Sequence, residues 1–224
     1  PTYAIAWTTT PWTLPSNTAL CVGPTIDYVL LRTVHPYTEE PCQILMAKAL
    51  VGTMFKEAPE VIQEFKGSEL VGIEYEQLIP WVNPGEGAFR IIPGDYVTTE
   101  DGTGIVHIAP TFAPTFGADD KRVAAQAGIP PLQMIDKDGK PQPMVDRTGK
   151  FFRIEDLDPE FVKNSMDVEA YRPYAGQFVK NAYDPNKTEK DKSLDVDIVV
   201  LLKEEGKLFK SEKHTHNYPH CWRT

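Results

Sequence analysis

The chain has 224 residues, of which 41% are hydrophobic and 25% charged, and its formal net charge at pH 7 is −9. This average composition excludes a disordered, collagen-like or coiled-coil chain, and the length allows one domain with its own hydrophobic core. The acidic charge argues against a free-standing nucleic-acid-binding protein, because Lys and Arg supply most contacts to phosphate.

The sequence contains no apolar stretch that approaches the roughly 20 residues needed to span a bilayer, and it does not open with a secretory signal. Its three cysteines, Cys21, Cys42 and Cys221, are too few and too scattered for a disulfide framework. We therefore expect a cytoplasmic protein without a membrane partner.

Twenty prolines and 15 glycines divide the chain into short segments, which favours strands and turns over long helices. The predicted strands are Tyr3–Trp7, Tyr28–Val34, Ile73–Leu78, Phe89–Ile92, Gly104–Ala109 and Leu208–Lys213. The predicted helices are Ala47–Glu57, Asp119–Ala127, Asp156–Ser165 and Leu194–Glu205. Because these elements do not alternate regularly, we predict a mainly β fold with peripheral α-helices around a bent, barrel-like core.

A threonine-rich run near the start of the chain is the first candidate site, Trp7-Thr8-Thr9-Thr10-Pro11-Trp12-Thr13-Leu14-Pro15-Ser16-Asn17. In a strand, Thr8 and Thr10 would share one face, and Pro11 would end the strand pairing. The clustered hydroxyls and amides could hold a water molecule or a carbonyl oxygen. A threonine-rich edge strand with a proline-capped turn explains the run equally well, and no adjacent base supports a hydroxyl nucleophile.

The second candidate runs from Asp101 through Gly102-Thr103-Gly104 to His107, and it is followed by Gly117-Ala118-Asp119-Asp120. The two glycines permit a sharp turn into a strand that carries His107 near its far end. A histidine and a carboxylate at the ends of neighbouring elements could converge on one pocket. The alternative is a hydrogen-bonded core histidine and an aspartate that caps a helix.

The third candidate is the C-terminal run from Lys213 to Trp222, in which three histidines and one cysteine lie close together. Their spacing matches none of the usual structural zinc patterns. We therefore predict no metal site and interpret the run as a solvated, strand-like connector.

Together, W-T-T-T-P-W-T-L-P-S-N, G-T-G-I-V-H-I-A-P with G-A-D-D, and Y-P-H-C-W-R resemble the editing (CP1) domain of isoleucyl-tRNA synthetases, which are class I aminoacyl-tRNA synthetases. Residues 67–76 are similar to the family's G-x-x-L-x-G-x-x-Y run. The T-T-T-P-W form favours the isoleucyl type, since valyl and leucyl relatives carry T-T-R-P at that point. Neither H-x-G-H nor K-M-S-K-S, the family's ATP-binding motifs, occurs in the sequence.

The resemblance implies that residues 1–224 are a single editing domain excised from a larger synthetase. Residues 1–18 and 207–224, approximately, would be strand-like connectors toward the catalytic domain. The implied activity is post-transfer editing, in which the domain hydrolyses the ester of mischarged valyl-tRNA(Ile) and excludes isoleucyl-tRNA(Ile) by size. No ligase activity is expected of the fragment alone.

The implied partners are the 3′-terminal adenosine of tRNA(Ile) carrying valine and the rest of the synthetase chain, with no membrane and no DNA. No cofactor is expected for editing, whereas ATP and Mg would act only in the catalytic domain of the parent. Two other readings stay open, a module that binds the tRNA acceptor end without efficient hydrolysis and a structural spacer. A valyl- or leucyl-type editing domain is a milder alternative.

The resemblance also assigns roles to single residues. Asp120 would pair with the substrate's α-ammonium group, and His107 would wall the side-chain pocket and help to reject isoleucine. Thr9 and Thr10 would bind the terminal adenosine and position the attacking water. The catalytic set is thus Thr9, Thr10, His107 and Asp120, and the substrate-binding set is Thr8, Trp12, Thr13, Asn17, His107 and Asp120.

One departure from the family pattern affects the second motif. Twelve residues separate His107 from Asp120, because Ala109-Pro110-Thr111-Phe112 is repeated directly as Ala113-Pro114-Thr115-Phe116. The repeat could bulge outward and leave Asp120 in place, or it could shift the helix start and displace the carboxylate. It could also be an artefact rather than a native feature.

Overall fold

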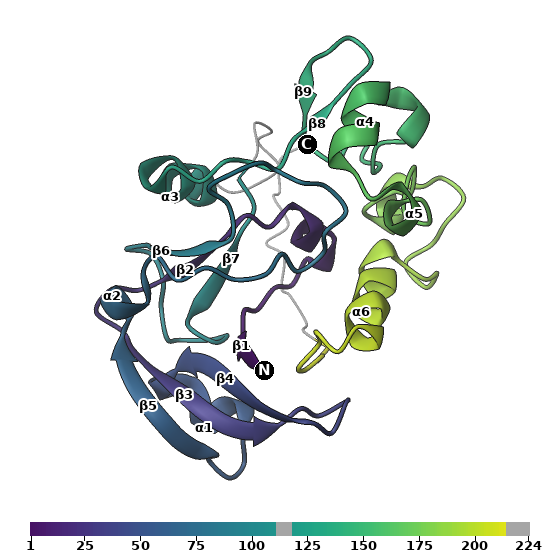
Figure 1. The fold of residues 1–224 in the computed structure, drawn as a ribbon. Coiled ribbons are helices and arrows are strands. Elements are labelled where there is room, and N and C mark those ends of the chain that lie inside the picture. The colour runs from purple at the N-terminus through teal and green to yellow at the C-terminus, as the bar shows by residue number, and fades with distance from the viewer. Residues whose placement is uncertain (111–117, 214–224) are drawn as a thin grey trace, which may run out of the picture.

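The computed structural model describes residues 1–110 and 118–213, and its β part consists of two main sheets and a two-stranded ribbon (Figure 1). The larger sheet has the strand order β1-β4-β3-β5. Its strands are β1 (Thr2–Ala4), β3 (Asp27–Val34), β4 (Pro41–Ala47) and β5 (Glu60–Lys66). β1 runs parallel to β4, and the other pairs are antiparallel. β3 and β4 are the most buried of these strands, which places the core of this sheet at its centre.

The second sheet carries the candidate site. It has the order β6-β2-β7 and consists of β2 (Ala19–Val22), β6 (Arg90–Pro93) and β7 (Ile105–Ile108). β2 is parallel to β6 and antiparallel to β7, and its register sets Leu20 opposite His107. A two-stranded ribbon, β8 (Met134–Ile135) with β9 (Pro141–Gln142), lies further along the chain.

The helices lie outside the sheets. Their bounds are α1 (Val51–Met54), α2 (Gly67–Leu70), α3 (Ala118–Ala127), α4 (Pro159–Ser165), α5 (Val168–Tyr171) and α6 (Leu194–Glu204). Short 3-10 helices are η1 (Pro11–Ser16), η2 (Lys48–Leu50), η3 (Ile154–Asp156) and η4 (Asn181–Tyr183). In Figure 1, α4, α5 and α6 gather on one side of the molecule and α3 on the other.

The helical side has a core of its own, built on aromatic side chains. Trp81 stacks on Tyr174 with the ring centroids 4.6 Å apart, and it meets Tyr171 edge-on. Trp12 of η1 belongs to the same core, together with buried residues of α6 such as Ile198. The segment that contains the threonine run is therefore anchored in the helical core.

The two sheets meet at the turn that precedes β7. The Ala47 N–H donates to the Thr103 carbonyl (2.8 Å), and the Tyr28 hydroxyl donates to the Gly104 carbonyl (2.6 Å). Gly104 has φ +76°, and a Cβ at this position would collide with the Ala47 side chain. Glycine is required here because the backbone is left-handed and the larger sheet approaches closely.

The prediction of a mainly β fold with peripheral helices is confirmed, although the described strands form separate sheets rather than a closed barrel. Strands close to those predicted at Tyr28–Val34, Phe89–Ile92 and Gly104–Ala109 are present. The predicted helices Asp119–Ala127 and Leu194–Glu205 are also found, with ends within one residue.

Several predicted elements are wrong or too long. Ile73–Leu78 makes one β-bridge, Glu74 with Arg90, and neither it nor Leu208–Lys213 is a strand. The helix predicted at Ala47–Glu57 is confined to η2 and α1, because β4 extends as far as Ala47. The strand at Tyr3–Trp7 shortens to β1, and the helix at Asp156–Ser165 begins at Pro159 after η3.

Two predictions lie outside the described residues. The duplicated segment, apart from its first two residues, falls within 111–117, which the structure does not describe. The histidine-rich run falls within 214–224, which is also outside the described residues except for Lys213. Within the described ranges, no helix is long and apolar enough to cross a membrane.

Candidate active site

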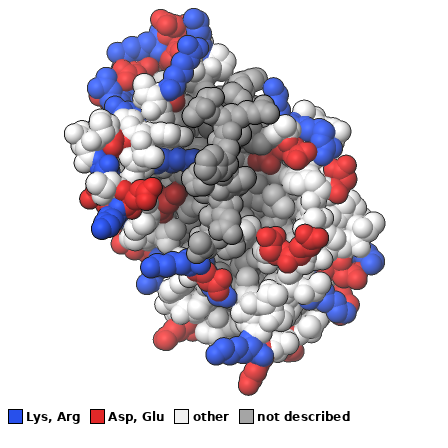
Figure 2. All heavy atoms as spheres, turned by 180° about the vertical axis from the view of Figure 1, so that it is seen from behind, with Lys and Arg blue, Asp and Glu red and all other residues white. Residues whose placement is uncertain are grey.

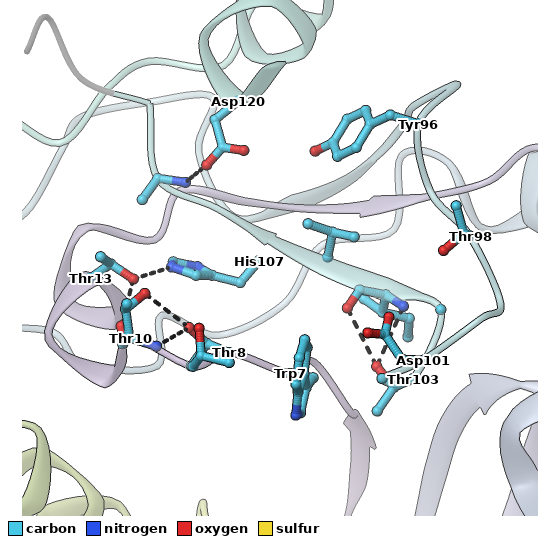
Figure 3. A pocket seen from close by; sticks show the side chains of 16 residues that line it. Trp7, Thr8, Thr10, Thr13, Tyr96, Thr98, Asp101, Thr103, His107 and Asp120 are labelled. Carbon is cyan, nitrogen blue, oxygen red and sulfur yellow. Dashed lines mark hydrogen bonds between the residues drawn. The ribbon is translucent and has the colours of Figure 1, made fainter. Parts of the chain in front are cut away.

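A pocket of about 390 Å³ lies where the threonine run, the segment 96–109 and the start of α3 converge (Figure 3). Its lining includes Thr8, Thr9, Thr10, Thr13, His107 and Asp120. The pocket thus brings together six of the eight residues that the sequence singles out. Trp7, Tyr96, Thr98, Ala109 and the Asp101–Val106 segment complete the lining.

The threonines are presented by a turn and not by a strand, so the predicted strand geometry is wrong. Trp7 forms a single parallel bridge to Val106, after which the chain leaves the sheet, and η1 begins at Pro11. Proline suits this first helical position, since its fixed φ is helical and its missing N–H would have no helical partner. Thr8 Oγ1 accepts from the Thr10 N–H (3.0 Å) and lies 3.4 Å from Thr10 Oγ1. Thr8 and Thr10 therefore share one side, as predicted, through a local turn.

His107 lies on β7 and is held at both ring nitrogens. Its Nε2 is 3.0 Å from Thr13 Oγ1, and its Nδ1 is 2.8 Å from Asn17 Nδ2. Thr13 Oγ1 also donates to the Thr10 carbonyl at 2.9 Å. Desolvation by burial lowers the pKa of His107 to about 4, so the imidazole is neutral at pH 7.

Asp120 is the third residue of α3 and faces the same pocket. Its Oδ2 accepts from the Ala109 N–H at 3.0 Å. Among the described residues, its second carboxylate oxygen accepts no hydrogen bond. Burial raises the pKa of this carboxyl. The preceding Asp119 is instead exposed and pairs with Arg122 (3.3 Å).

The position of Asp120 bears on the duplicated segment. Asp120 shares the pocket with His107, so the alternative in which the carboxylate stays at the site agrees with the described residues.

Trp12 and Asn17 lie behind the pocket instead of lining it. Trp12 is buried in the helical core, and its backbone N–H donates to Asp195 Oδ1 at 2.8 Å. Asn17 is also buried, and its Oδ1 accepts from the Tyr75 hydroxyl at 2.6 Å. Asn17 contacts the lining directly, with its Nδ2 2.8 Å from His107 Nδ1, whereas Trp12 anchors the segment that carries Thr13 to the helical core.

Trp12, Asn17 and their partners Asp195 and Tyr75 form a supporting layer behind the pocket. Asp195 and Tyr75 are not among the site residues predicted from the sequence. Asp195 lies in the first turn of α6, where acidic residues are common, so nothing distinguishes it in the sequence from a helix-capping acid. Tyr75 closes the G-x-x-L-x-G-x-x-Y run, which is a usable signal without an assigned role.

The described residues contain no cluster of three or more His, Cys, Asp or Glu side chains placed to hold a metal ion. On the face shown in Figure 2, Lys and Arg side chains are interspersed with Asp and Glu over the residues described.

No family model matches the chain. Its sequence is 59% identical over 239 aligned positions to isoleucine–tRNA ligase of Bacteroides fragilis and 56% identical over 240 positions to that of Porphyromonas gingivalis. Each alignment covers 99% of this chain and 21% of the relative, so the chain spans about a fifth of the length of these ligases.

A solved structure supports the fold. The crystal structure of GlLeuRS-CP1 matches with a TM-score of 0.51 and 17% identity, covering 94% of this chain and 84% of that one. The chain is thus homologous over its whole length to one segment of the isoleucine–tRNA ligases, and it has the fold of a leucyl-tRNA synthetase CP1 domain.

Proposed function

We propose that this chain is the editing domain of an isoleucyl-tRNA synthetase and hydrolyses the ester of valyl-tRNA(Ile). The observation that carries the proposal is one pocket with two different walls. The threonine–histidine wall consists of Thr8, Thr10, Thr13 and His107, and the carboxylate wall is Asp120. A cavity of about 390 Å³ falls within the range of small-molecule sites.

A second site is needed because a pocket that accepts isoleucine cannot strongly exclude valine. The missing methylene is worth only about 1–3 kcal/mol, a general range for which isoleucyl-tRNA synthetases themselves are the standard example. A separate hydrolytic pocket that admits valine and refuses the larger side chain solves this problem by size.

The carboxylate wall suits the α-ammonium group of the aminoacyl ester. One oxygen of Asp120 is held by the Ala109 N–H, and the other has no donor among the described residues. A bound ammonium group would supply that donor and would favour the ionised carboxylate, offsetting the desolvation that raises its pKa.

The threonine–histidine wall suits a fixed size limit. Hydrogen bonds at both ring nitrogens prevent His107 from rotating away without breaking at least one of them. A wall held in this way does not yield to an additional methyl group, so we assign the rejection of isoleucine to His107.

Hydrolysis requires little beyond positioning, because an aminoacyl ester is already activated. Thr9 and Thr10 line the pocket. We assign to their hydroxyls the orientation of the terminal ribose and of a water molecule. We propose no metal or other cofactor for this step, and retained hydrolysis after chelation would support this.

The proposal is tested by deacylation of valyl-tRNA(Ile) and isoleucyl-tRNA(Ile) with the chain in excess. Excess protein is needed because an acidic domain with interspersed charges is expected to bind tRNA weakly without the rest of the synthetase. Selective loss of the valyl ester is the expected result. Equal cleavage of both esters would contradict the size limit.

The second candidate, an acceptor-end binding module with impaired hydrolysis, is favoured by the duplicated segment before Asp120. Binding of a non-hydrolysable valyl-adenosine analogue without turnover would identify it. Deleting residues 113–116 removes one copy, and recovery of hydrolysis in that variant would assign the impairment to the duplication.

A further inference from the structure

The run at residues 67–76 places Tyr75 in contact with Asn17, behind the pocket. After α2, Gly72 adopts φ +91° and its N–H donates to the Ile91 carbonyl at 2.9 Å. The Tyr75 N–H donates to the Phe89 carbonyl, also at 2.9 Å. These backbone hydrogen bonds hold the segment alongside β6 and fix the position of the Tyr75 backbone.

The Tyr75 side chain is clamped at both its ring and its hydroxyl. Its ring packs edge-on against Phe89 with the centroids 5.9 Å apart, and its hydroxyl donates to Asn17 Oδ1 at 2.6 Å. Burial raises the pKa of Tyr75, so this hydroxyl stays protonated and continues to donate.

The opposite end of the Asn17 amide faces acceptors. Its Nδ2 donates to the Ala19 carbonyl (2.8 Å) and, more weakly, to the Ile108 carbonyl (3.3 Å). Carbonyl oxygens only accept, so this end must be the NH₂ group. The same NH₂ lies 2.8 Å from His107 Nδ1, which must therefore be an unprotonated acceptor.

The proton of the neutral imidazole then lies on Nε2, and its partner agrees with this assignment. Thr13 Oγ1 uses its own hydrogen for the Thr10 carbonyl, so it accepts from the Nε2–H of His107. A continuous set of donors and acceptors thus runs from Tyr75 through Asn17 and His107 to the threonine turn.

We infer that Tyr75 is a positioning residue for His107. It holds the Asn17 amide in the orientation that keeps the imidazole neutral, with its proton on Nε2 and donated to Thr13. The tautomer follows from the geometry alone, whereas its consequence for hydrolysis rests on the proposed function. Without the phenol, Asn17 Oδ1 loses this donor and the amide loses its restraint on His107.

The tautomer can be observed directly by nitrogen-15 NMR of histidine-labelled protein, using the whole chain. The sequence has five histidines, and the spectrum of a His107→Gln variant assigns the signals of His107. We expect a single Nε2-protonated form in the unmutated chain. In Tyr75→Phe, the His107 shifts should move toward a mixture of tautomers. Unchanged His107 shifts in Tyr75→Phe would overturn the inference.

A second variant tests the same linkage from Asn17. In Asn17→Asp the carboxylate cannot donate, so His107 Nδ1 should become protonated and its nitrogen-15 shift should move from the unprotonated to the protonated range. A His107 Nδ1 that stays unprotonated in this variant would show that Asn17 does not set the tautomer, which also overturns the inference.

Deacylation supplies the functional test. Tyr75→Phe should lower kcat for valyl-tRNA(Ile) by about tenfold or less, the effect of one lost hydrogen bond, and should leave KM unchanged. The matched control is Tyr171→Phe, which removes a phenolic hydroxyl that donates to the Phe152 carbonyl in the helical core. A loss of equal size in both variants would indicate general destabilisation and count against Tyr75.

Deacylation and nitrogen-15 NMR together distinguish a failure of the proposed function from a failure of the positioning role of Tyr75. If the unmutated chain does not deacylate either ester, the proposed function fails, and the nitrogen shifts alone decide the role of Tyr75. If the chain is active but the shifts do not move in Tyr75→Phe, the positioning role fails while the proposed function stands.

Discussion

The two walls of the pocket are built on opposite principles. On the threonine–histidine wall, both nitrogens of His107 are already bonded within the protein, and the pKa of the ring is lowered to about 4. On the carboxylate wall, Asp120 has one backbone donor, and burial raises its pKa. A ring with both nitrogens bonded is suited to define a shape. A desolvated carboxylate, one oxygen of which accepts no hydrogen bond from the described residues, is suited to bind a cation.

The carboxylate wall should give the largest effect. Asp120→Asn keeps the size of the side chain but removes the charge that would pair with an α-ammonium group. A hydrogen bond to a charged group is worth about 1.5–3 kcal/mol, so kcat/KM for valyl-tRNA(Ile) should fall by roughly 10- to 150-fold.

The matched control for this prediction is Asp119→Asn, the exposed neighbour on the same helical turn. It changes the net charge equally and leaves the pocket untouched. Equal activity of the two variants would contradict a special role for Asp120.

The threonine–histidine wall should control selectivity more than rate. His107→Ala removes a fixed ring and enlarges the cavity, so isoleucyl-tRNA(Ile) should become a substrate. Since a methylene is worth about 1–3 kcal/mol, the preference for the valyl ester should drop by roughly tenfold or more. The measurement is the ratio of the two deacylation rates, and an unchanged ratio would show that another residue sets the size limit.

The same wall predicts a dependence of stability on pH. The pKa of His107 falls from an ordinary value near 6.5 to about 4 in the folded chain. Between these values the unfolded chain binds more protons, so this residue makes stability decrease as the pH falls from about 6.5 to 4. The loss is on the order of a few kcal/mol.

Denaturant unfolding at a series of pH values in that window measures this slope. His107→Gln should flatten it, because glutamine does not titrate. Asp120 has the opposite effect on stability. Because burial raises the pKa of its carboxyl, protonation removes the cost of burying the charge, and this residue makes stability increase as the pH falls. A slope that is the same in His107→Gln and the unmutated chain would contradict a partly buried histidine that is neutral when folded.

The sequence predicts the pocket better than it predicts the sheets. Threonines near a proline, a histidine behind a G-x-G turn and an acid at a helix start are local signals, and all converge on one cavity. β5 escapes prediction because most of its side chains are exposed and its composition is polar. β4 escapes it because its apolar residues run without alternation into η2.

The pairings within the supporting layer could not be predicted from the sequence, for a different reason. Tyr75 meets Asn17 across 58 positions, and Asp195 meets Trp12 across 183. Such pairings depend on how separate elements pack, and no local pattern encodes them.

The smallest expected effect concerns the anchor of the threonine turn to the helical core. Asp195→Ala leaves the buried Trp12 N–H without its acceptor, which costs about 1–3 kcal/mol of stability. Because η1 carries Thr13, which contacts His107, deacylation should slow by several-fold, with kcat more affected than KM.

Two further variants of α6 serve as controls for this prediction. Asp195→Asn keeps an acceptor oxygen and should restore most of the rate. Asp197→Ala, which removes a nearby acid of the same helix that pairs with Lys192, is the surface control. If Asp195→Ala matches Asp197→Ala in both stability and rate, the helical core does not hold the threonine turn in place.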